Sequence, residues 1–258
     1  MQLKEINNHL PSTIFDKSCS GPCIVIGSGP SQKKLIENEA WKSFYTISVN
    51  WSQILFPSQM FFWQDGSFVS QTKANISKKQ FISCSILPTS KKAIENKHLM
   101  QNVGGIYINR IPTRERPEWL DSKNSSKLQS CSPISGAIAI CMAYIMGFNP
   151  IIIIGFDCNI GDYRYMKKHP QFGNFNKRGA DKHAETQVRL LKNYGNDMGI
   201  INCSETEAIT RFNFHKIIKQ QKDANKNRCQ SIVKDIYINS CKENAATYIN
   251  QWKKKIPV

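Results

Sequence analysis

A nearly unbroken series of apolar and small residues runs from position 136 to position 146. A helix that is apolar on most of its circumference is a buried one, so this segment predicts a buried helix. Ser135 can cap its start, and Gly147 can end it in the left-handed conformation that glycine favours. The β-branched run at residues 151–154 follows, and such continuous hydrophobicity is typical of a strand buried on both faces of a parallel sheet.

Short apolar segments recur along the chain and alternate with segments of helical pattern. We expect further strands at residues 22–26, 45–49, 59–63, 80–87, 103–108 and 199–203. Helices are expected at residues 30–44 and 183–194, whereas residues 112–131 lack periodicity and predict a surface excursion. This alternation predicts an α/β fold, with a Rossmann-like, mostly parallel sheet that carries helices on both faces.

The pattern divides the chain into a Rossmann-like domain at residues 1–212 and a basic segment at residues 213–258. Residues 159–182 lack periodicity, and because a structureless loop of this length is usually functional, they predict a lid. The basic segment has apolar residues at partly helical spacing, which predicts one or two amphipathic helices. These helices can pack on the domain, join protomers in a homo-oligomer or contact a membrane surface, and packing is the favoured interpretation.

The formal net charge is +16, from 35 Lys and Arg against 19 Asp and Glu. This charge favours anionic partners such as nucleotides, nucleic acid or an acidic membrane surface, although it also fits charges that are simply spread over a solvated surface. No apolar run approaches the roughly 18 residues that cross a membrane, and the polar start is not typical of a signal peptide. Nine cysteines without CxxC pairs predict reduced, buried thiols in a cytoplasm, with Cys23, Cys141 and Cys203 inside expected elements.

The first expected strand runs into the turn Gly27-Ser28-Gly29-Pro30-Ser31, which opens a helix. Glycines let a backbone approach a phosphate, and a helix N-terminus offers free N–H groups, so this turn is a candidate phosphate cradle. The turn matches neither the dinucleotide fingerprint nor a Walker loop, because Gln32 stands where the third glycine belongs and no GK[ST] follows. A tight turn without a ligand is the alternative.

Polar residues stand at the carboxyl ends of three expected strands: Asn50, Asp65 and Asp157. Ligands of open α/β sheets bind outside these ends, so the three residues are candidates for one site. Asn50 can bond a base or a ribose, and Asp65 or Asp157 can hold a magnesium ion or a sugar hydroxyl. Each can also be a plain turn residue.

The predicted lid carries Tyr163, Tyr165 and His169, and His183 follows at the expected start of a helix, which Asp181 can cap. A histidine beside a mobile loop can act as a general base, and tyrosines can donate to a phosphate leaving group. His169 also fits an exposed loop position, and His183 fits a helix start without chemistry. The sequence has no HExxH, no paired cysteine ligands and no GxSxG, which disfavours a zinc protease or an α/β-hydrolase.

Four features occur together in this order: VIGSGPS, an Asn after the second strand, SGAIAICMAYIMGF before IIIIGFD, and a late GIINCSE. Together they resemble the 6-hydroxymethylpterin pyrophosphokinase MptE-like family, which includes the Maf-type flagellin glycosyltransferases. The same order is similar to bacterial sialyltransferases that use CMP-sialic acid. The resemblance covers roughly residues 22–212.

The resemblance implies a role for each matching position. The turn residues Gly27, Gly29, Pro30 and Ser31 would cradle the nucleotide phosphates, Asn50 would contact the donor, and Asp157 would close the pocket floor. Ser135 and Gly136 would line the same pocket. Tyr163 and Tyr165 would stabilise the departing phosphate, and His183 would be the general base.

The resemblance favours a glycosyltransferase that moves a sugar from a CMP-type donor to a glycan or protein hydroxyl without a cofactor. One alternative is a pyrophosphokinase that uses ATP and magnesium held by Asp65 and Asp157. The other is a basic protein that binds nucleic acid and has no enzymatic activity. The expected location is the cytoplasm, with peripheral contact at the inner membrane surface as an option.

Overall fold

The computed structural model describes residues 19–50, 52–56, 58–63, 81–86, 106–112, 117, 120, 128–130, 134–158 and 177–221. Side chains are described throughout these ranges except at positions 54, 55, 81–86, 106–112, 128–130 and 177–183.

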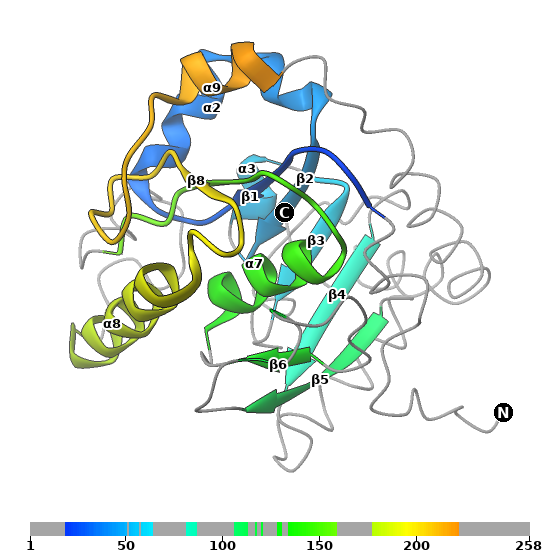
Figure 1. Ribbon diagram of the computed structural model, residues 1–258, viewed down its shortest axis with the longest axis vertical. Helices are drawn as coiled ribbons and strands as arrows, with labels where there is room; N and C mark the ends of the chain where they lie inside the picture. Colours follow the sequence, from blue (N-terminus) through cyan, green and yellow to red (C-terminus); the bar gives the residue numbers. More distant parts are fainter. Residues whose placement is uncertain are drawn as a thin grey trace, which may run out of the picture.

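A parallel sheet forms the centre of the fold (Figure 1), with the strand order β6-β5-β4-β3-β2-β1-β7-β8. Every neighbouring pair of strands is parallel. The strands are β1 (Cys23–Ile26), β2 (Tyr45–Val49), β3 (Met60–Trp63), β4 (Phe81–Ile86), β5 (Ile106–Pro112), β6 (Leu128–Ser130), β7 (Ile151–Ile154) and β8 (Ile200–Asn202). The α/β, Rossmann-like prediction is therefore confirmed at the level of a parallel sheet with helices.

The strand order reverses at β1. The chain adds β2 to β6 on one side of β1 and then returns to place β7 and β8 on the other side. Ile26, the last residue of β1, pairs with Ser48 of β2 and with Ile154 of β7. The carboxyl ends of these three strands therefore meet, and such a switch point is where open α/β sheets bind ligands.

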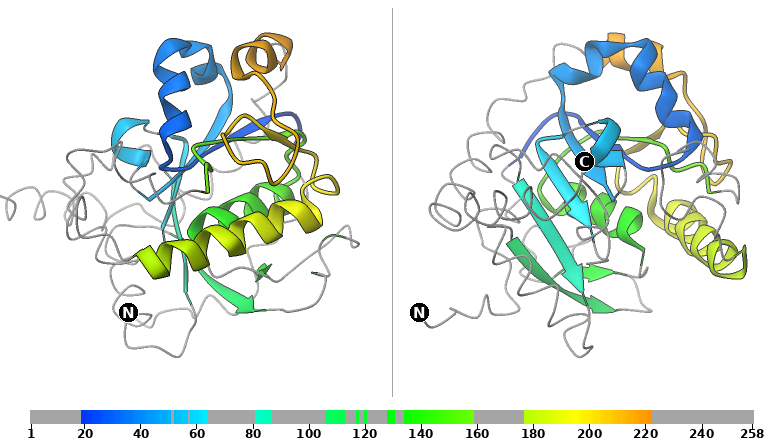
Figure 2. Two further views of the ribbon diagram at one scale, coloured as in Figure 1. Left: turned by 90° about the vertical axis from the view of Figure 1, so that its left-hand side faces the viewer. Right: turned by 180° about the vertical axis from the view of Figure 1, so that it is seen from behind.

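Helices cover both faces of the sheet, and each face has its own core (Figure 2). On one face, α7 (Ser135–Ile145) and α8 (Lys177–Tyr194) pack side by side against strand residues such as Val25 and Ile153. The remaining helices are short: η1 (Pro30–Lys33), α2 (Lys34–Glu37), η2 (Glu39–Ser43), α3 (Ser52–Leu55) and α9 (Phe214–Gln221). On the other face, strand residues such as Ile24 and Ile152 pack against apolar side chains of α2, η2 and α9.

Helix boundaries differ from the predicted ones at three places. The helix expected at residues 30–44 is divided into η1, α2 and η2, because Asn38 is extended and its side chain caps η2 by accepting a hydrogen bond from the N–H of Ala40. Ser135 is the first helical residue of α7 and not its cap, a position that Ile134 holds. Gly147 has φ of 97°, so its predicted role in ending α7 is confirmed.

Two segments that were predicted to be irregular contain regular structure. β6 lies within residues 112–131. α8 begins at Lys177, so the last six positions of the predicted lid are helical and Asp181 lies inside the helix that it was expected to cap. The sequence pattern missed this start because Lys, Arg, Gly and Asp give the first turns no apolar periodicity. Residues 159–176 of the predicted lid lie outside the described residues.

The cysteines follow the prediction in part. Cys23, Cys141 and Cys203 are buried thiols that form no disulfide, as expected. Burial raises the pKa of Cys203 to about 12 and that of Cys23 well above its usual value, so both thiols stay protonated and unreactive. Cys19, in contrast, takes part in a disulfide, and for this residue the expectation of a reduced thiol is wrong. No spacing rule in the sequence indicates that bond.

The described start of the basic C-terminal segment belongs to the domain core. Phe214, Ile217 and Ile218 of α9 are buried with Leu35 of α2 and Trp41 of η2. Packing, the favoured interpretation of this segment, therefore holds for α9. Within the described part of the chain, every helix is too short or too polar to cross a bilayer.

We predict that Phe214→Ala lowers the free energy of unfolding by about 3–5 kcal/mol, because it leaves a cavity in a packed core. Phe214 is 1% exposed, whereas Phe212, only two positions earlier, is 45% exposed. Phe212→Ala is therefore the matched control and should change stability by less than about 0.5 kcal/mol. Urea unfolding measures the stability of both variants. A Phe214→Ala loss as small as that of Phe212→Ala would show that α9 is not part of the core.

Candidate functional site

The turn after β1 is bound directly to the turn after β7. The N–H of Gly29 donates to the carbonyl of Gly155 at 2.8 Å, and the N–H of Gly155 donates to Oγ of Ser31 at 2.9 Å. Gly155 has φ of 76°, and a Cβ there would collide with the backbone of Gly27. The glycines on both sides of this contact are needed because the two backbones approach too closely for a side chain.

Asp157 joins three turns through one carboxylate. Its Oδ2 accepts the N–H of Ser31 at 2.8 Å, and its Oδ1 accepts the N–H of Glu205 at 2.7 Å. The side chain is only 4% exposed. Its two oxygens thus tie the turns after β1 and β7 to the segment after β8.

Each oxygen of Asp157 accepts one backbone N–H, so a magnesium ion at this carboxylate would share both oxygens with these hydrogen bonds. The other predicted ligand, Asp65, lies outside the described residues. Among the described residues, His, Cys, Asp and Glu form no group of three or more that could hold a metal ion.

The predicted phosphate cradle has fewer open N–H groups than its sequence suggests. The N–H groups of Gly27, Gly29 and Ser31 are bonded to Ile154, Gly155 and Asp157, and Pro30 has none. A Cβ on Gly29 would also collide with the carboxylate of Asp157. Within the described part of the chain, Ser28 is the turn residue whose N–H has no partner. A ligand phosphate can therefore use this N–H but not the whole turn.

Asn50 stands beside this turn in a backbone conformation that non-glycine residues seldom adopt. Its φ is 51°, in the left-handed region that Asn tolerates better than most residues, and its N–H donates to Phe62 at 2.9 Å. Its segment is anchored to β1, because Oγ of Ser52 donates to the carbonyl of Ile26 at 2.7 Å. Oδ1 of Asn50 is buried and has no hydrogen-bond partner in the described structure. Unusual backbone conformations and unpaired buried polar atoms both tend to occur at functional sites.

The start of α7 completes this edge of the sheet. Ile134, at its N-cap, provides no side-chain acceptor for the first N–H groups of the helix. Gly136 lies against Phe156 of the β7 turn, since a Cβ at this position would be 2.6 Å from Cε1 of Phe156. The same Cβ would be 3.2 Å from Oε1 of Gln187 on α8. The side chain of Gln187 therefore reaches the N-terminus of α7.

Gln187 is a candidate residue that the sequence analysis missed. It is 5% exposed, and its Nε2 has no partner among the described residues. A signal was present in the sequence, because Gln187 precedes Leu190 and Leu191 by three and four positions, a spacing that places it on their buried helix face. A polar side chain on a buried helix face indicates a candidate binding residue, since buried polar groups normally have hydrogen-bond partners.

Two basic side chains, Lys34 and Arg211, lie beside Glu205 at the carboxyl edge of the sheet. Glu205, whose N–H holds Asp157, pairs through its side chain with Lys34 at 2.6 Å and with Arg211 at 2.8 Å. The hydrogen bond from Lys34 and the nearby positive charges lower the pKa of Glu205. The carboxylate is therefore ionised at neutral pH, and two cations share its single charge.

The structure thus gathers most of the predicted donor-binding residues at one place, which we call the carboxyl-edge site. It consists of Gly27, Ser28, Gly29, Pro30, Ser31, Asn50, Ser135, Gly136, Asp157 and the added Gln187. Tyr163, Tyr165, His169 and Asp65 lie outside the described residues. The backbone of His183 lies in α8, one helical turn before Gln187, but its side chain is not among those described.

Comparison with family models and with curated proteins finds no match for this chain. The family resemblance and the roles that it implies therefore stay predictions.

We predict that Asp157→Asn lowers the free energy of unfolding by about 2–4 kcal/mol, because an amide cannot accept both backbone N–H groups and loses the charge that strengthens both bonds. Glu207→Gln, which changes an exposed acidic residue two positions beyond Glu205, should change stability by less than about 0.5 kcal/mol. Urea unfolding followed by circular dichroism compares the two. An Asp157→Asn variant as stable as wild type would contradict the structural role of this carboxylate.

Proposed function

We propose that this protein is a nucleotide-sugar-dependent glycosyltransferase, sialyltransferase-like or Maf-like, which transfers a sugar from a CMP-type donor to a hydroxyl acceptor. One observation carries the proposal. Residues that the family resemblance assigns to donor binding come from four separate segments, and they lie together at the carboxyl edge, where the strand order reverses. This is the edge at which α/β sheets bind nucleotides.

The chemistry of the edge suits an anionic donor. The N-terminus of α7 carries the positive end of a helix dipole, and Ile134 at its N-cap provides no side-chain cap. Nε2 of Gln187 and the N–H of Ser28 add two hydrogen-bond donors that have no partner in the described structure. Oδ1 of Asn50 adds an acceptor, which suits an amino or hydroxyl group of the donor.

His183 is proposed as the general base that deprotonates the acceptor hydroxyl, and Tyr163 and Tyr165 are proposed to stabilise the leaving phosphate. Support for His183 comes from the helix register, because it lies one turn before Gln187, toward the N-terminal end of α8. A helix that connects β7 to β8 in a parallel sheet starts near the carboxyl ends of the strands. The magnesium-dependent pyrophosphokinase stays the alternative, since each oxygen of Asp157 keeps a lone pair beside its hydrogen bond and Asp65 lies outside the described residues.

The proposal is tested by a thermal-shift series with CMP, CDP, UDP, GDP and ATP, each with and without magnesium. A ligand that binds only the folded state raises the melting temperature. We expect the largest shift with CMP and no requirement for magnesium. A shift with ATP that needs magnesium would overturn the glycosyltransferase proposal in favour of the pyrophosphokinase.

Gln187→Leu should weaken CMP binding by about tenfold without lowering stability, since the change removes a ligand hydrogen bond and also an unpaired buried amide. Gln220→Leu, on the exposed face of α9, is the control and should leave the affinity unchanged. Isothermal titration calorimetry gives the affinities, and thermal unfolding gives the stabilities. Loss of stability with full affinity would instead assign Gln187 a purely structural role.

His183→Ala should lower the rate of sugar transfer by about 10²- to 10⁴-fold, the usual contribution of a positioned base. Binding of CMP should stay nearly intact, because the base acts on the acceptor and not on the donor. His215→Ala, at an exposed position on α9, should retain the full rate. Normal turnover of the His183→Ala variant would place the base elsewhere.

A further inference from the structure

Six buried side-chain nitrogen and oxygen atoms in the described part of the chain have no hydrogen-bond partner. Buried polar groups are normally paired, so each such atom needs an explanation, and a bound ligand is one of them. The six belong to Gln32, Tyr45, Asn50, Gln53, Trp63 and Gln187. Three of these residues, Asn50, Gln53 and Trp63, stand at or just after the carboxyl ends of β2 and β3, and we call them the β2–β3 cluster.

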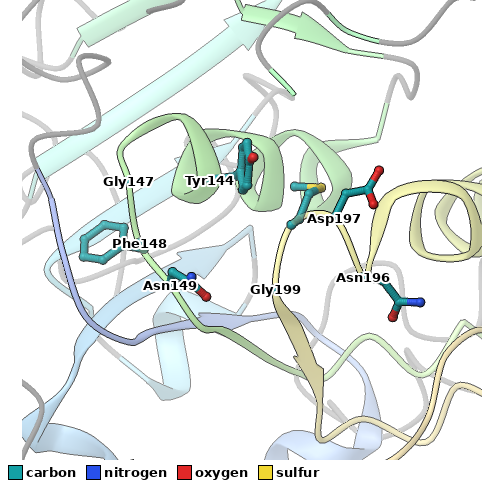
Figure 3. Close-up of a pocket in the computed structure, with 8 residues that line it drawn as sticks. Tyr144, Gly147, Phe148, Asn149, Asn196, Asp197 and Gly199 are labelled. Atoms are coloured by element: carbon teal, nitrogen blue, oxygen red, sulfur yellow. The ribbon is translucent and has the colours of Figure 1, made fainter. Parts of the chain in front are cut away.

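A cavity of about 360 Å³ elsewhere in the molecule lacks such atoms. It lies between the end of α7 and the turn before β8 (Figure 3), and its lining includes Tyr144 and Asp197. Both residues already have interaction partners, and none of the six unpaired atoms belongs to a residue of the lining. The unsatisfied polar groups therefore favour the β2–β3 cluster over this cavity as a ligand site.

The backbone of Asn50 joins the three residues of the cluster. Its N–H donates to the carbonyl of Phe62 at 2.9 Å, and Phe62 immediately precedes Trp63. Its carbonyl accepts the N–H of Gln53 at 3.3 Å. The three residues are therefore held together where two neighbouring strands end.

The side chains of Gln53 and Trp63 lie on the same face of the sheet. Ser48 of β2 pairs in register with Phe61 of β3, so the two side chains point to one face. Oγ of Ser48 donates to Oε1 of Gln53, and the ring of Phe61 stacks on that of Trp63 with 4.9 Å between centroids. The amide of Gln53 and the indole of Trp63 thus lie beside the same pair of strand residues.

The neighbours of Gln53 fix which end of its amide is unpaired. Oε1 accepts the N–H of Ser58 at 3.2 Å in addition to Oγ of Ser48. A backbone N–H can only donate, so the oxygen must face Ser58 and the NH₂ group is the end without a partner. The indole N–H of Trp63 is likewise a donor only. With Oδ1 of Asn50, the cluster offers two donors, one acceptor and no charge.

A complementary ligand group donates one hydrogen bond, accepts two and is uncharged, because a buried charge without a counter-charge is costly. A nucleobase fits poorly, since bases stack on open ring faces, whereas Trp63 is 0% exposed and already stacked on Phe61. A secondary amide fits, because its N–H donates and its carbonyl oxygen accepts twice. A hydroxyl has the same count, but it would have to make all three bonds at a single oxygen, whereas an amide makes them at two separate atoms.

We propose that the β2–β3 cluster binds an acetamido group on the transferred sugar, and that Gln53 and Trp63 select this group. Their N–H groups donate to the carbonyl oxygen, and Oδ1 of Asn50 accepts the amide N–H. This inference rests on the proposed function, in which the donor phosphate lies between the turn after β1 and the start of α7. Because β2 is the neighbour of β1, a sugar attached to that phosphate can extend to the cluster.

The test is a calorimetric titration of the full chain with two matched pairs of nucleotide sugars. CMP-N-acetylneuraminate and CMP-ketodeoxynononate differ by an acetamido group in place of a hydroxyl, and UDP-N-acetylglucosamine and UDP-glucose differ in the same way. We expect the acetamido member of the CMP pair to bind about tenfold more tightly. Binding of either pair without this preference overturns the inference alone. Absence of binding by both CMP sugars overturns the proposed function, and absence of binding by all four ligands overturns both.

Trp63→Phe keeps an aromatic ring and removes the indole N–H, so it should reduce the preference from about tenfold to about threefold or less. Trp41→Phe is the matched control, because Nε1 of Trp41 already donates to the carbonyl of Leu35 at 2.9 Å. This control should lose stability and keep the full preference. An unchanged preference in Trp63→Phe would refute the assignment to the cluster, and if that variant does not fold, the wild-type pairs still decide.

Discussion

The fold depends on one closely packed contact, in which the turns after β1 and β7 meet around the carboxylate of Asp157. This carboxylate is buried and accepts backbone N–H groups from residues far apart in the chain, Ser31 and Glu205. Because Gly27 and Gly155 have no side chains, the two backbones can pair directly beyond the ends of their strands. The contact therefore fixes how the two halves of the sheet join at the switch point.

That contact also decides where a ligand can bind. The hydrogen bonds between the two turns occupy the space directly between β1 and β7, and they use most of the N–H groups that a phosphate would need. Two of the six unpaired buried side-chain atoms among the described residues lie to either side, at Asn50 after β2 and at Gln187 beside the start of α7. A donor at this edge would thus be held mainly by the helix start and these two amides, with the glycine turn as part of the wall.

The two edges of the sheet differ in electrostatic character for the same topological reason. In a parallel sheet with connecting helices, the helix N-termini gather at the carboxyl edge and the helix C-termini gather at the amino edge. α7 therefore presents a positive dipole end to the carboxyl-edge site, whereas α7 and α8 direct their negative ends toward the amino edge.

The sequence by itself determined the class of fold. Continuous β-branched runs such as residues 151–154 predicted buried parallel strands, and the apolar segment before them predicted α7, because hydrophobic burial acts locally and leaves a periodic pattern. Gly147 was predicted to end α7 because glycine favours the left-handed conformation, and Asp157 was predicted at a strand end because it follows the β-branched run. The polar start of α8 was missed, since packing and not apolar periodicity sets that boundary.

Only the tertiary structure decided what the candidate residues contact. The sequence could not indicate that β7 and its turn use the N–H groups of the glycine turn, that each oxygen of Asp157 accepts a backbone N–H, or that Gln187 reaches Gly136. Nor could it indicate that the side chain of Asn149 would lie against Gly199, about fifty residues later in the chain. The physical reason is that hydrogen bonds and contacts of this kind form between segments distant in the chain, and their geometry leaves no periodic pattern in the sequence.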